Sequence, residues 1–525
     1  MSKQGSPNHP SPRPELAELH ARKAKTQDAA RPEAVDRRRA TNQRTARENV
    51  GDLCDSDSFL EYGGLALAAQ RMRHDEDELI KRSPADGLIT GIGTVNGAAF
   101  GSEKARCMVL AYDYTVFAGT QGATNHKKMD RMLELAEQQQ LPVVLFAEGG
   151  GGRPNDTDWH IVAGLDLPTF GRFARLSGQV PQVGIASGRC FAGNASLLGC
   201  CNVIIATENA NIGMGGPPMV EGGGLGTFAP EEIGPIDVQS ANGVVDVRVA
   251  DEAEAVRVAK QYLSYFQGPL TNWECGEQAP LRDLIPDNRR RAYDVRKVIH
   301  ALADTGSVLE LRREFGRPLV TALVRIEGRA MGLVANDSRH LGGAIDARAS
   351  DKMARFLQLC DSFGIPILSL CDTPGFMVGP DTEETAQVRH TSRIFVTAAS
   401  LRVPWFTVVL RKAYGLGAMA MAGGSTHASF FSVAWPTGEF GAMGLEGAVN
   451  IAFKQQLAEV ADPEEREAMF QQLVQLAYDR GKALNTAAHL EIDDVIDPVE
   501  TRRWLVRGLA SAGTIRPSRR TIDTW

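Results

Sequence analysis

The chain has 525 residues, 43% of them hydrophobic, and this length is too great for one hydrophobic core, so about two to four domains are expected. The formal net charge of −7 argues against non-specific nucleic-acid binding, and no apolar run approaches the roughly 18 residues that a membrane helix needs. Eight cysteines without a C-x-x-C pair argue against a structural zinc site and a disulfide scaffold, and they favour a reducing, cytoplasmic compartment.

Changes in composition along the chain predict its organisation. Residues 1–14 are polar and rich in proline, which predicts a disordered tail. Residues 15–48 are rich in Ala, Arg and Glu and predict a helical arm, either solvated or in contact with another subunit. A charged linker at Asp287–Tyr293 divides the remainder into two expected domains, residues 49–286 and residues 287–525.

An internal repeat relates these two domains. The segment KMDRMLELAEQQQLPVVLF begins at Lys128, and KMARFLQLCDSFGIPILSL begins 224 residues later, at Lys352. In both, apolar residues at helical spacing give way after a proline to a short apolar run, which predicts a helix, a turn and a buried strand. VPQVGIASGRCFAGNA, from Val180, matches VPWFTVVLRKAYGLGA, from Val403, at an offset of 223 residues. The sequence therefore predicts two homologous α/β domains in tandem.

Two glycine-containing turns follow predicted strands in each repeat. They are EGGGGRP (Glu148–Pro154), GRCFAGN (Gly188–Asn194), DTPGFMVG (Asp372–Gly379) and RKAYGLGA (Arg411–Ala418). One such turn could be only a tight connection, but four at matching places favour a ligand site at the carboxyl ends of strands. The sequence lacks the motifs of P-loop, nucleophilic-serine and zinc-hydrolase chemistry. Paired backbone amides that stabilise an enolate oxygen suit these turns best.

Longer strings carry a family resemblance. They are TARENVGDLCDSDSFLEYG, ITGIGTVNG, DYTVFAGTQG, HLGGAIDARASDKMARFLQLCDSFGIPIL, DTPGFMVG, RKAYGLGA and GAMGLEGAV. From Thr45 to Leu509 the chain resembles the carboxyltransferase subunits of biotin-dependent acyl-CoA carboxylases, such as those for propionyl-, methylcrotonyl- and acetyl-CoA. The resemblance implies an α/β fold of two tandem crotonase-like (ClpP/crotonase) ββα-spiral domains. It also implies carboxyl transfer from carboxybiotin to the α-carbon of an acyl-CoA.

The same resemblance implies partners. Biotin would be carried by a biotin carboxyl carrier and carboxylated by a biotin carboxylase on other chains, since this sequence has no Ala-Met-Lys-Met site and no ATP-grasp pattern. A homohexamer, a trimer of dimers, is expected, with the active site where the first domain of one subunit meets the second domain of another. No metal, nucleic acid or membrane is expected. A biotin-dependent acyl-CoA decarboxylase subunit and a non-catalytic scaffold paralogue remain as alternatives.

Site residues follow from the resemblance. Amides at Ala192 and Gly193 would hold the thioester enolate, and those at Leu416 and Gly417 would hold the ureido oxygen of biotin. Alanine and leucine stand where the family has glycine, and the donors survive this replacement if φ stays negative. The residues expected to contact acyl-CoA are Gly150, Gly151 and Arg153, with Lys128 either at the CoA phosphates or a solvated surface lysine. The residues expected to line the biotin pocket are Asp372, Thr373, Pro374, Gly375 and Phe376.

Two departures from the family pattern bear on the substrate. Met419 follows the second oxyanion turn, where short-chain members of the family can carry an acidic residue. A flexible apolar side chain there predicts tolerance of a longer or bulkier acyl group. The string EGGGGRPNDTDW also replaces the usual Asp-Ser-Gly-Gly-Ala-Arg. Together they suggest a divergent branch related to single-chain or long-chain acyl-CoA carboxylases.

Overall fold

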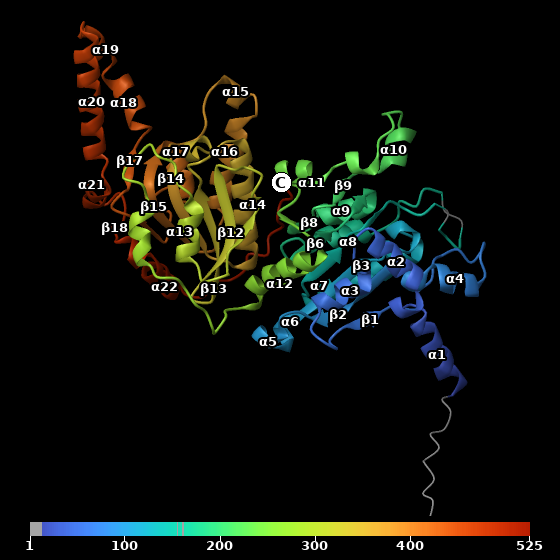
Figure 1. Ribbon diagram of the computed structural model, residues 1–525. Coiled ribbons are helices and arrows are strands. Elements are labelled where there is room, and N and C mark those ends of the chain that lie inside the picture. The colour runs from blue at the N-terminus through green and yellow to red at the C-terminus, as the bar shows by residue number, and fades with distance from the viewer. Residues whose placement is uncertain (1–12, 155, 160–161) are drawn as a thin grey trace, which may run out of the picture.

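The computed structural model describes residues 13–154, 156–159 and 162–525. The predicted disordered tail, residues 1–14, therefore lies almost wholly outside the described residues. The described chain forms two halves, each built on one β-sheet with helices on both faces (Figure 1).

The first half contains a seven-stranded sheet in the order β1-β2-β3-β4-β6-β8-β10. The pairs β1–β2 and β2–β3 are antiparallel and the remaining pairs are parallel. The central strands are buried on both faces, as their continuous apolar runs require. The strands are β1 (Leu60–Tyr62), β2 (Leu88–Thr94), β3 (Arg106–Tyr112), β4 (Val143–Phe146), β6 (Gln182–Ala186), β8 (Val203–Thr207) and β10 (Val247–Val249).

The second half repeats this order and these senses in the sheet β11-β12-β13-β14-β15-β16-β18. An eighth strand, β17, pairs with the far end of β15, just as β5, β7 and β9 form a small parallel layer in the first half. The repeated topology confirms the predicted tandem of α/β domains. The bounds are β11 (Leu309–Leu311), β12 (Leu319–Ile326), β13 (Arg329–Asn336), β14 (Ile367–Thr373), β15 (Trp405–Tyr414), β16 (Phe431–Ala434), β17 (Glu439–Gly441), β18 (Asp494–Val495), β5 (Gly149–Gly150), β7 (Arg189–Phe191) and β9 (Asn211–Gly213).

Helices cover each sheet in layers. α7 (Ala123–Gln139), α8 (Thr169–Arg175) and α9 (Ala192–Gly199) pack on one face of the first sheet. Its other face is covered by α3 (Ala46–Leu53) and α12 (Glu252–Gln267), which share a core with α14 (Ala347–Phe363) and α16 (Gln387–Ala398) of the second half. The outer face of the second sheet carries α13 (Val295–Leu302) and α22 (Thr501–Ser511).

The repeated helices α7 and α14 each have 17 residues. Asp346 caps α14 by accepting a hydrogen bond from the Ala349 N–H. Each helix ends at a residue of positive φ, Gln140 at 51° and Gly364 at 71°, which turns the chain into the following strand. The two halves meet where Phe266 of α12 packs edge-on against Phe363 of α14, with ring centroids 4.9 Å apart.

The predicted helical arm forms α1 (Pro14–Ala24), α2 (Pro32–Ala40) and the start of α3. The residues of α1 are exposed or half-buried, and this helix extends away from the body (Figure 1). α2 instead packs onto the first half, where Arg38 is only 5% exposed. Within this chain the arm is therefore partly exposed and partly an integral layer of the first half.

Two further segments complete the molecule. α18 (Leu445–Ala452), α19 (Lys454–Glu459), α20 (Pro463–Arg480) and α21 (Ala483–Ala488) stand out from the second half (Figure 1). The last residues return to the first half, where the hydroxyl of Ser177 donates to the Ile522 carbonyl and accepts from its N–H, each at 3.1 Å. Residues 287–525 are therefore not confined to the second half. Within the described residues, no helix is both long and apolar enough to cross a membrane.

Smaller elements connect these layers. They are α4 (Glu76–Arg82), α5 (Gly97–Phe100), α6 (Ser102–Ala105), α10 (Pro217–Gly222), α11 (Ile236–Ala241), α15 (Pro380–Glu383), α17 (Gly415–Met421) and several short 3₁₀ turns, of which η6 (Leu341–Gly343) precedes α14.

Candidate functional site

The four glycine turns predicted from the sequence meet in two pairs, one pair in each half. In the first half, β5 pairs with β7, and β7 leads directly into α9 at Ala192. In the second half, Thr373 at the end of β14 is opposite Ala413 of β15, and β15 leads directly into α17 at Gly415. Each half thus holds a strand-end turn against the start of a helix.

The helix starts correspond residue by residue. Ala192 and Gly415 are the first residues of α9 and α17, and both have positive φ, 51° and 56°. Ala192 is therefore the counterpart of Gly415, and Gly193 is the counterpart of Leu416. The pair Leu416–Gly417 lies one residue further along its turn than the pair Ala192–Gly193. The condition that φ stays negative fails at Ala192, where the left-handed conformation costs about 1–2 kcal/mol for a residue with a Cβ.

The turns of each pair lie so close together that several of their positions have no room for a side chain. A Cβ at Gly417 would lie 2.6 Å from the carbonyl carbon of Gly375, so the second pair of turns touches backbone to backbone. In the first half a Cβ at Gly193 would lie 2.3 Å from Oε1 of Gln121, and one at Gly151 would lie 3.9 Å from the Cβ of Ala192. Each predicted pair is thus placed beside the other turn of its own half.

These helix starts offer hydrogen-bond donors. The first N–H groups of an α-helix have no partner within the helix. Among the described residues, neither α9 nor α17 has a side-chain cap at its N-terminus. Both junctions can therefore present main-chain amides to an anionic oxygen, which requires no acid or base side chain.

The predicted biotin-pocket residues divide into two groups. Asp372 and Thr373 are fully buried, and their side chains hold the turn: Asp372 accepts from Arg411 Nη2 at 2.9 Å, and Thr373 Oγ1 accepts from the Gly375 N–H at 3.1 Å. Pro374 and Phe376 are half-buried and remain partly accessible. Asp372 and Thr373 are thus supports of the turn rather than surfaces that face a ligand.

Arg153 and Lys128 are engaged inside the first half. Nη1 of Arg153 lies 2.5 Å from Oδ1 of Asp86 and 3.4 Å from Oδ2 of Asp156, and the arginine side chain is 4% exposed. The ammonium of Lys128 is buried and donates to the carbonyls of Ala85, at 3.0 Å, and Leu88. The predicted contact of Lys128 with CoA phosphates is therefore wrong, and so is its alternative as a solvated lysine.

The repeat partner of Lys128 behaves in the same way. Nζ of Lys352 donates to the carbonyls of Phe315 and Leu319, at 3.0 and 2.6 Å, and this residue is 2% exposed. Burial lowers the pKa of Lys352 to about 7 and that of Lys128 to about 8. The lysines shared by the two repeats are therefore internal hydrogen-bond donors.

A cavity of about 840 Å³ lies beside α17. Leu416, 60% exposed, and Met419, 41% exposed, lie on its wall together with Phe440. Arg480 and His489 also line it. The predicted specificity residue Met419 thus faces an open space with apolar walls next to the second pair of turns.

One charged pair at the first site was not predicted. Glu148, which directly precedes the glycine turn, is buried and accepts from both terminal nitrogens of Arg38, at 2.6 and 2.9 Å. Burial raises the pKa of Glu148 to about 7, while Arg38 acts in the opposite direction. An acidic residue before the GGGG run is the only signal of this pair in the sequence, because its partner lies 110 residues away.

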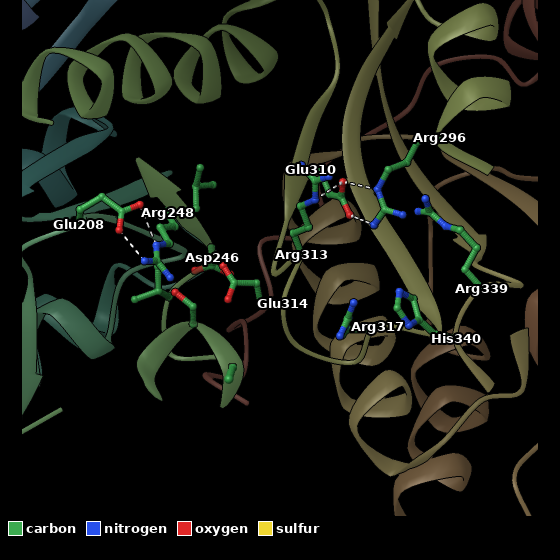
Figure 2. A pocket seen from close by; sticks show the side chains of 14 residues that line it. Glu208, Asp246, Arg248, Arg296, Glu310, Arg313, Glu314, Arg317, Arg339 and His340 are labelled. Atoms are coloured by element: carbon green, nitrogen blue, oxygen red, sulfur yellow. Dashed lines mark hydrogen bonds and ion pairs between the residues drawn. The ribbon is translucent and has the colours of Figure 1, made fainter. Parts of the chain in front are cut away.

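A second cavity, of about 920 Å³, lies between the halves (Figure 2). Figure 2 shows the ion pair of Arg248 with Glu208 on one side and that of Arg296 with Glu310 on the other. His340 lies on the second side. The cavity is lined by charged residues rather than by the glycine turns. No group of three His, Cys, Asp or Glu side chains in the described parts of the chain could hold a metal.

Comparison with known proteins identifies close relatives. The carboxyl transferase domain model matches residues 37–517. The methylmalonyl-CoA carboxyltransferase 12S subunit of Propionibacterium freudenreichii is 32% identical over 499 residues, which cover 92% of this chain and 91% of that protein. The biotin-dependent long chain acyl-coenzyme A carboxylase beta4 subunit of Mycobacterium tuberculosis is 30% identical over 94% of this chain and 93% of its own.

Solved structures agree. A single-chain, multi-domain long-chain acyl-CoA carboxylase superimposes with a TM-score of 0.91 and 57% identity over 95% of this chain, which spans about half (49%) of that protein. The hexameric transcarboxylase 12S, with methylmalonyl-coenzyme A bound, superimposes with a TM-score of 0.82 and 31% identity over 96% of each chain. These likenesses confirm the expected tandem crotonase-like fold. The chain belongs to the carboxyl transferase domain family, in the group of biotin-dependent acyl-CoA carboxyltransferases.

Proposed function

We propose that this chain is the carboxyltransferase component of a biotin-dependent acyl-CoA carboxylase. It transfers a carboxyl group from carboxybiotin, carried by another polypeptide or domain, to the α-carbon of an acyl-CoA. The observation that carries this proposal is the duplicated junction of a glycine turn with an uncapped helix start, one in each half, in a family whose relatives are named for this reaction. Two separate oxyanion sites are what a transfer between a ureido group and a thioester requires.

The first half is the proposed acyl-CoA site. Amides at Ala192 and Gly193 hold the thioester oxygen as it becomes an enolate oxygen. Gly150 and Gly151 leave room for the thioester to approach the backbone. Arg153 anchors the far end of the same turn through Asp86, so its role is to place the turn rather than to bind the substrate.

The second half is the proposed biotin site. The residues fit this group, because the backbone contact of Gly375 with Gly417 holds the two turns together, and the start of α17 at Gly415 and Leu416 borders an open cavity. Amides at Leu416 and Gly417 would hold the ureido oxygen, with Pro374 and Phe376 at the side of the pocket. When bound, biotin supplies the carboxyl group and, after its loss, the base for the α-proton. The chain itself contributes proximity and preorganised donors.

The acyl group is proposed to be long. In the proposed hexamer the cavity beside α17 would face the acyl-CoA half of a neighbouring subunit, so it could receive the end of the acyl chain. It has apolar walls at Leu416, Met419 and Phe440, and its volume of about 840 Å³ exceeds the needs of an acetyl or propionyl group. A flexible methionine in the wall adapts to acyl groups of different shape. The 57% identity to a long-chain acyl-CoA carboxylase supports the same choice.

The proposed partners are a biotin carboxylase and a biotin carboxyl carrier. A homohexamer is also proposed, since the transcarboxylase 12S relative is a hexamer and the chain covers 96% of it. Each half keeps its junction of a strand with an uncapped helix start, although Ala192 and Leu416 stand where glycine is expected. This favours an enzyme over a non-catalytic scaffold. No described feature favours the decarboxylase alternative.

The test is a transfer assay with the purified chain. Carboxylated carrier and acyl-CoAs of increasing chain length are supplied, and 2-carboxyacyl-CoA is measured by mass spectrometry. We expect product formation with kcat/KM rising toward long chains. No product with any acyl-CoA would refute the function, and a preference for acetyl-CoA or propionyl-CoA would refute the proposed substrate class.

A further inference from the structure

The two halves support their strand-end carboxylates differently. In the second half, Asp372 is held by Arg411 of the adjacent strand, through Nε at 3.3 Å and Nη2 at 2.9 Å. The repeat places Gly188 at the position of Arg411, so the first half has no arginine at that position, and the neighbouring Arg189 pairs with Glu231 instead. A Cβ at Gly188 would lie 2.6 Å from Nε2 of Gln43 and 3.1 Å from Oε1 of Glu148. Side chains from elsewhere in the chain therefore fill the place of the missing arginine.

Arg38 of α2 supplies the missing guanidinium. Its two terminal nitrogens meet the two carboxylate oxygens of Glu148 at 2.6 and 2.9 Å, and its Nε donates to the Arg44 carbonyl at 2.8 Å. Gln43 adds a donor to Glu148 at 3.2 Å. A bidentate charge-assisted contact of this kind fixes both distance and orientation. The carboxylate is therefore clamped by the N-terminal arm.

Glu148 transmits this clamp to both turns of the first site. Its next residue is Gly149, the start of the glycine turn. Its carbonyl accepts from Nδ2 of Asn194, in the first turn of α9, at 3.0 Å. The same amide donates to the Gly119 carbonyl at 3.1 Å. One buried side chain thus connects α2 to the two backbone segments that present the proposed enolate donors.

We propose that Arg38 is a positioning residue of the acyl-CoA half of the site, and that the N-terminal arm is thereby a functional part of that half. This inference rests on the proposed function. Arg38 acts through Glu148 on the spacing between the glycine turn and the start of α9. The corresponding positioning residue of the biotin half is Arg411.

Removal of Arg38 leaves the buried carboxylate of Glu148 without a cationic partner. Apart from the neutral amide of Gln43, the described groups that act on this carboxylate are Glu252 of α12, which also lies 3.6 Å from Arg38, Asp113 after β3 and the thiol of Cys190 on β7, and none of these is a cation. The pKa of Glu148 is already raised to about 7 by burial. Without its partner the carboxylate takes up a proton or moves toward water, and either change shifts the turn.

The experiment compares Arg38→Met with Arg37→Met and Arg411→Met in the full chain. Transfer is measured in reverse, from a 2-carboxyacyl-CoA to free biocytin, with each substrate varied separately. Arg38→Met should lower kcat/KM for the CoA substrate by about 10²-fold, the effect of a displacement near 1 Å, and leave the KM for biocytin within twofold. Arg411→Met should show the opposite split. Arg37 is exposed, so Arg37→Met, which removes the same charge from the same helix, should leave both unchanged.

A second measurement is independent of turnover. Amide hydrogen exchange at Gly149–Gly152 should accelerate in Arg38→Met and stay at the wild-type rate in Arg37→Met. If Arg38→Met does not fold, Arg38→Lys replaces it. That variant keeps the charge but loses the fork, so about a tenfold loss in kcat/KM for the CoA substrate is expected.

The possible results distinguish a failure of the positioning role of Arg38 from a failure of the proposed function. Wild-type kinetics and exchange in a folded Arg38 variant, or equal losses for both substrates, would overturn the positioning role. A wild-type chain that transfers nothing would refute the proposed function alone, and the exchange result would then decide the link between Arg38 and the turn.

Discussion

Single residues in this chain show what a repeat does and does not reveal. Lys128 and Lys352 are identical in the two repeats, yet neither reaches a ligand, because each ammonium is buried and donates to two carbonyls. The repeat shows that this position is shared, but the identity of the residue does not show whether the lysine is exposed or buried. The lysine is buried if it lies on the side of the helix that packs against the sheet, and it is exposed if it lies on the other side.

The titration of Lys352 gives a pH-dependent stability. Its pKa is lowered from 10.5 to about 7, so between these values the unfolded chain binds the extra proton. The contribution of Lys352 to the free energy of unfolding therefore rises with pH in this window, by at most about 1.4 kcal/mol per pH unit. In Lys352→Met this rise should disappear when urea unfolding is followed from pH 7 to 10. A difference from wild type that is constant with pH would contradict this, and exposed Lys81→Met serves as the control.

The contact between the turns of the second half allows only glycine at position 417. In Gly417→Ala the new Cβ would overlap the backbone of Gly375, 2.6 Å away, so transfer should fall by at least about 10²-fold through displaced donors. Gly444→Ala is the matched control, because a Cβ there meets open space within the described part of the chain. Steady-state assays compare the transfer rates of both variants with wild type. Normal transfer by Gly417→Ala would exclude this placement of the biotin donors.

Met419 is expected to set the acyl-chain preference. Met419→Asp introduces a charge into the apolar wall of the cavity beside α17, where a long acyl group would desolvate it. The ratio of kcat/KM for long over short acyl-CoA should fall by about tenfold or more. Competition between a long and a short acyl-CoA measures this ratio directly. An unchanged ratio would remove Met419 from the specificity argument.

At the scale of elements, the strand-turn-helix order was predictable and the supports of the turns were not. The helices α7 and α14, their following prolines and the strands β4 and β14 all follow from local periodicity, because each element is determined mostly by its own residues. The Arg38–Glu148 pair joins residues 110 positions apart, and local patterns carry no information about it. The positive φ of Ala192 likewise arises from the abrupt passage of β7 into α9.

The start of α9 gives a prediction for this element. Ala192 has φ of 51°, which glycine adopts without strain and a β-branched residue strongly disfavours. Ala192→Gly should retain transfer and change the free energy of unfolding by less than about 1 kcal/mol, since relief of strain offsets the greater chain entropy. Ala192→Val should destabilise by more than about 1 kcal/mol and reduce transfer. Denaturant unfolding separates the variants, and equal stability of both would disprove the strain.

At the scale of the whole molecule, the two halves are joined through a common interior and a returning chain end. The repeat predicts two domains, and the sequence of neither half indicates that it packs against the other. The structure instead places α12 against α14 and directs the last residues back to Ser177. Such long-range packing depends on which apolar faces remain uncovered, which residue periodicity does not specify.

Residues 517–525 should therefore stabilise the assembly of the halves. Ile522 is 4% exposed, and Ser362 donates to the Arg520 carbonyl at 2.7 Å. Truncation after Arg516 should lower the free energy of unfolding by about 3 kcal/mol, the loss expected for a large buried apolar side chain. Calorimetry should show a lower Tm. Deletion of Pro14–Ala24, whose residues are exposed or half-buried, should leave the Tm nearly unchanged, and equal effects of the two deletions would contradict this role.

The edge-on packing of Phe266 on Phe363 has a consequence for the ancestry and engineering of this chain. Once two copies of a duplicated unit bury opposite faces against each other, the units can no longer diverge independently at those faces. A hybrid that takes its first half from one relative and its second from another receives the two aromatic partners from different parents, so it should fold well only where the two parents carry side chains that fit each other at these positions.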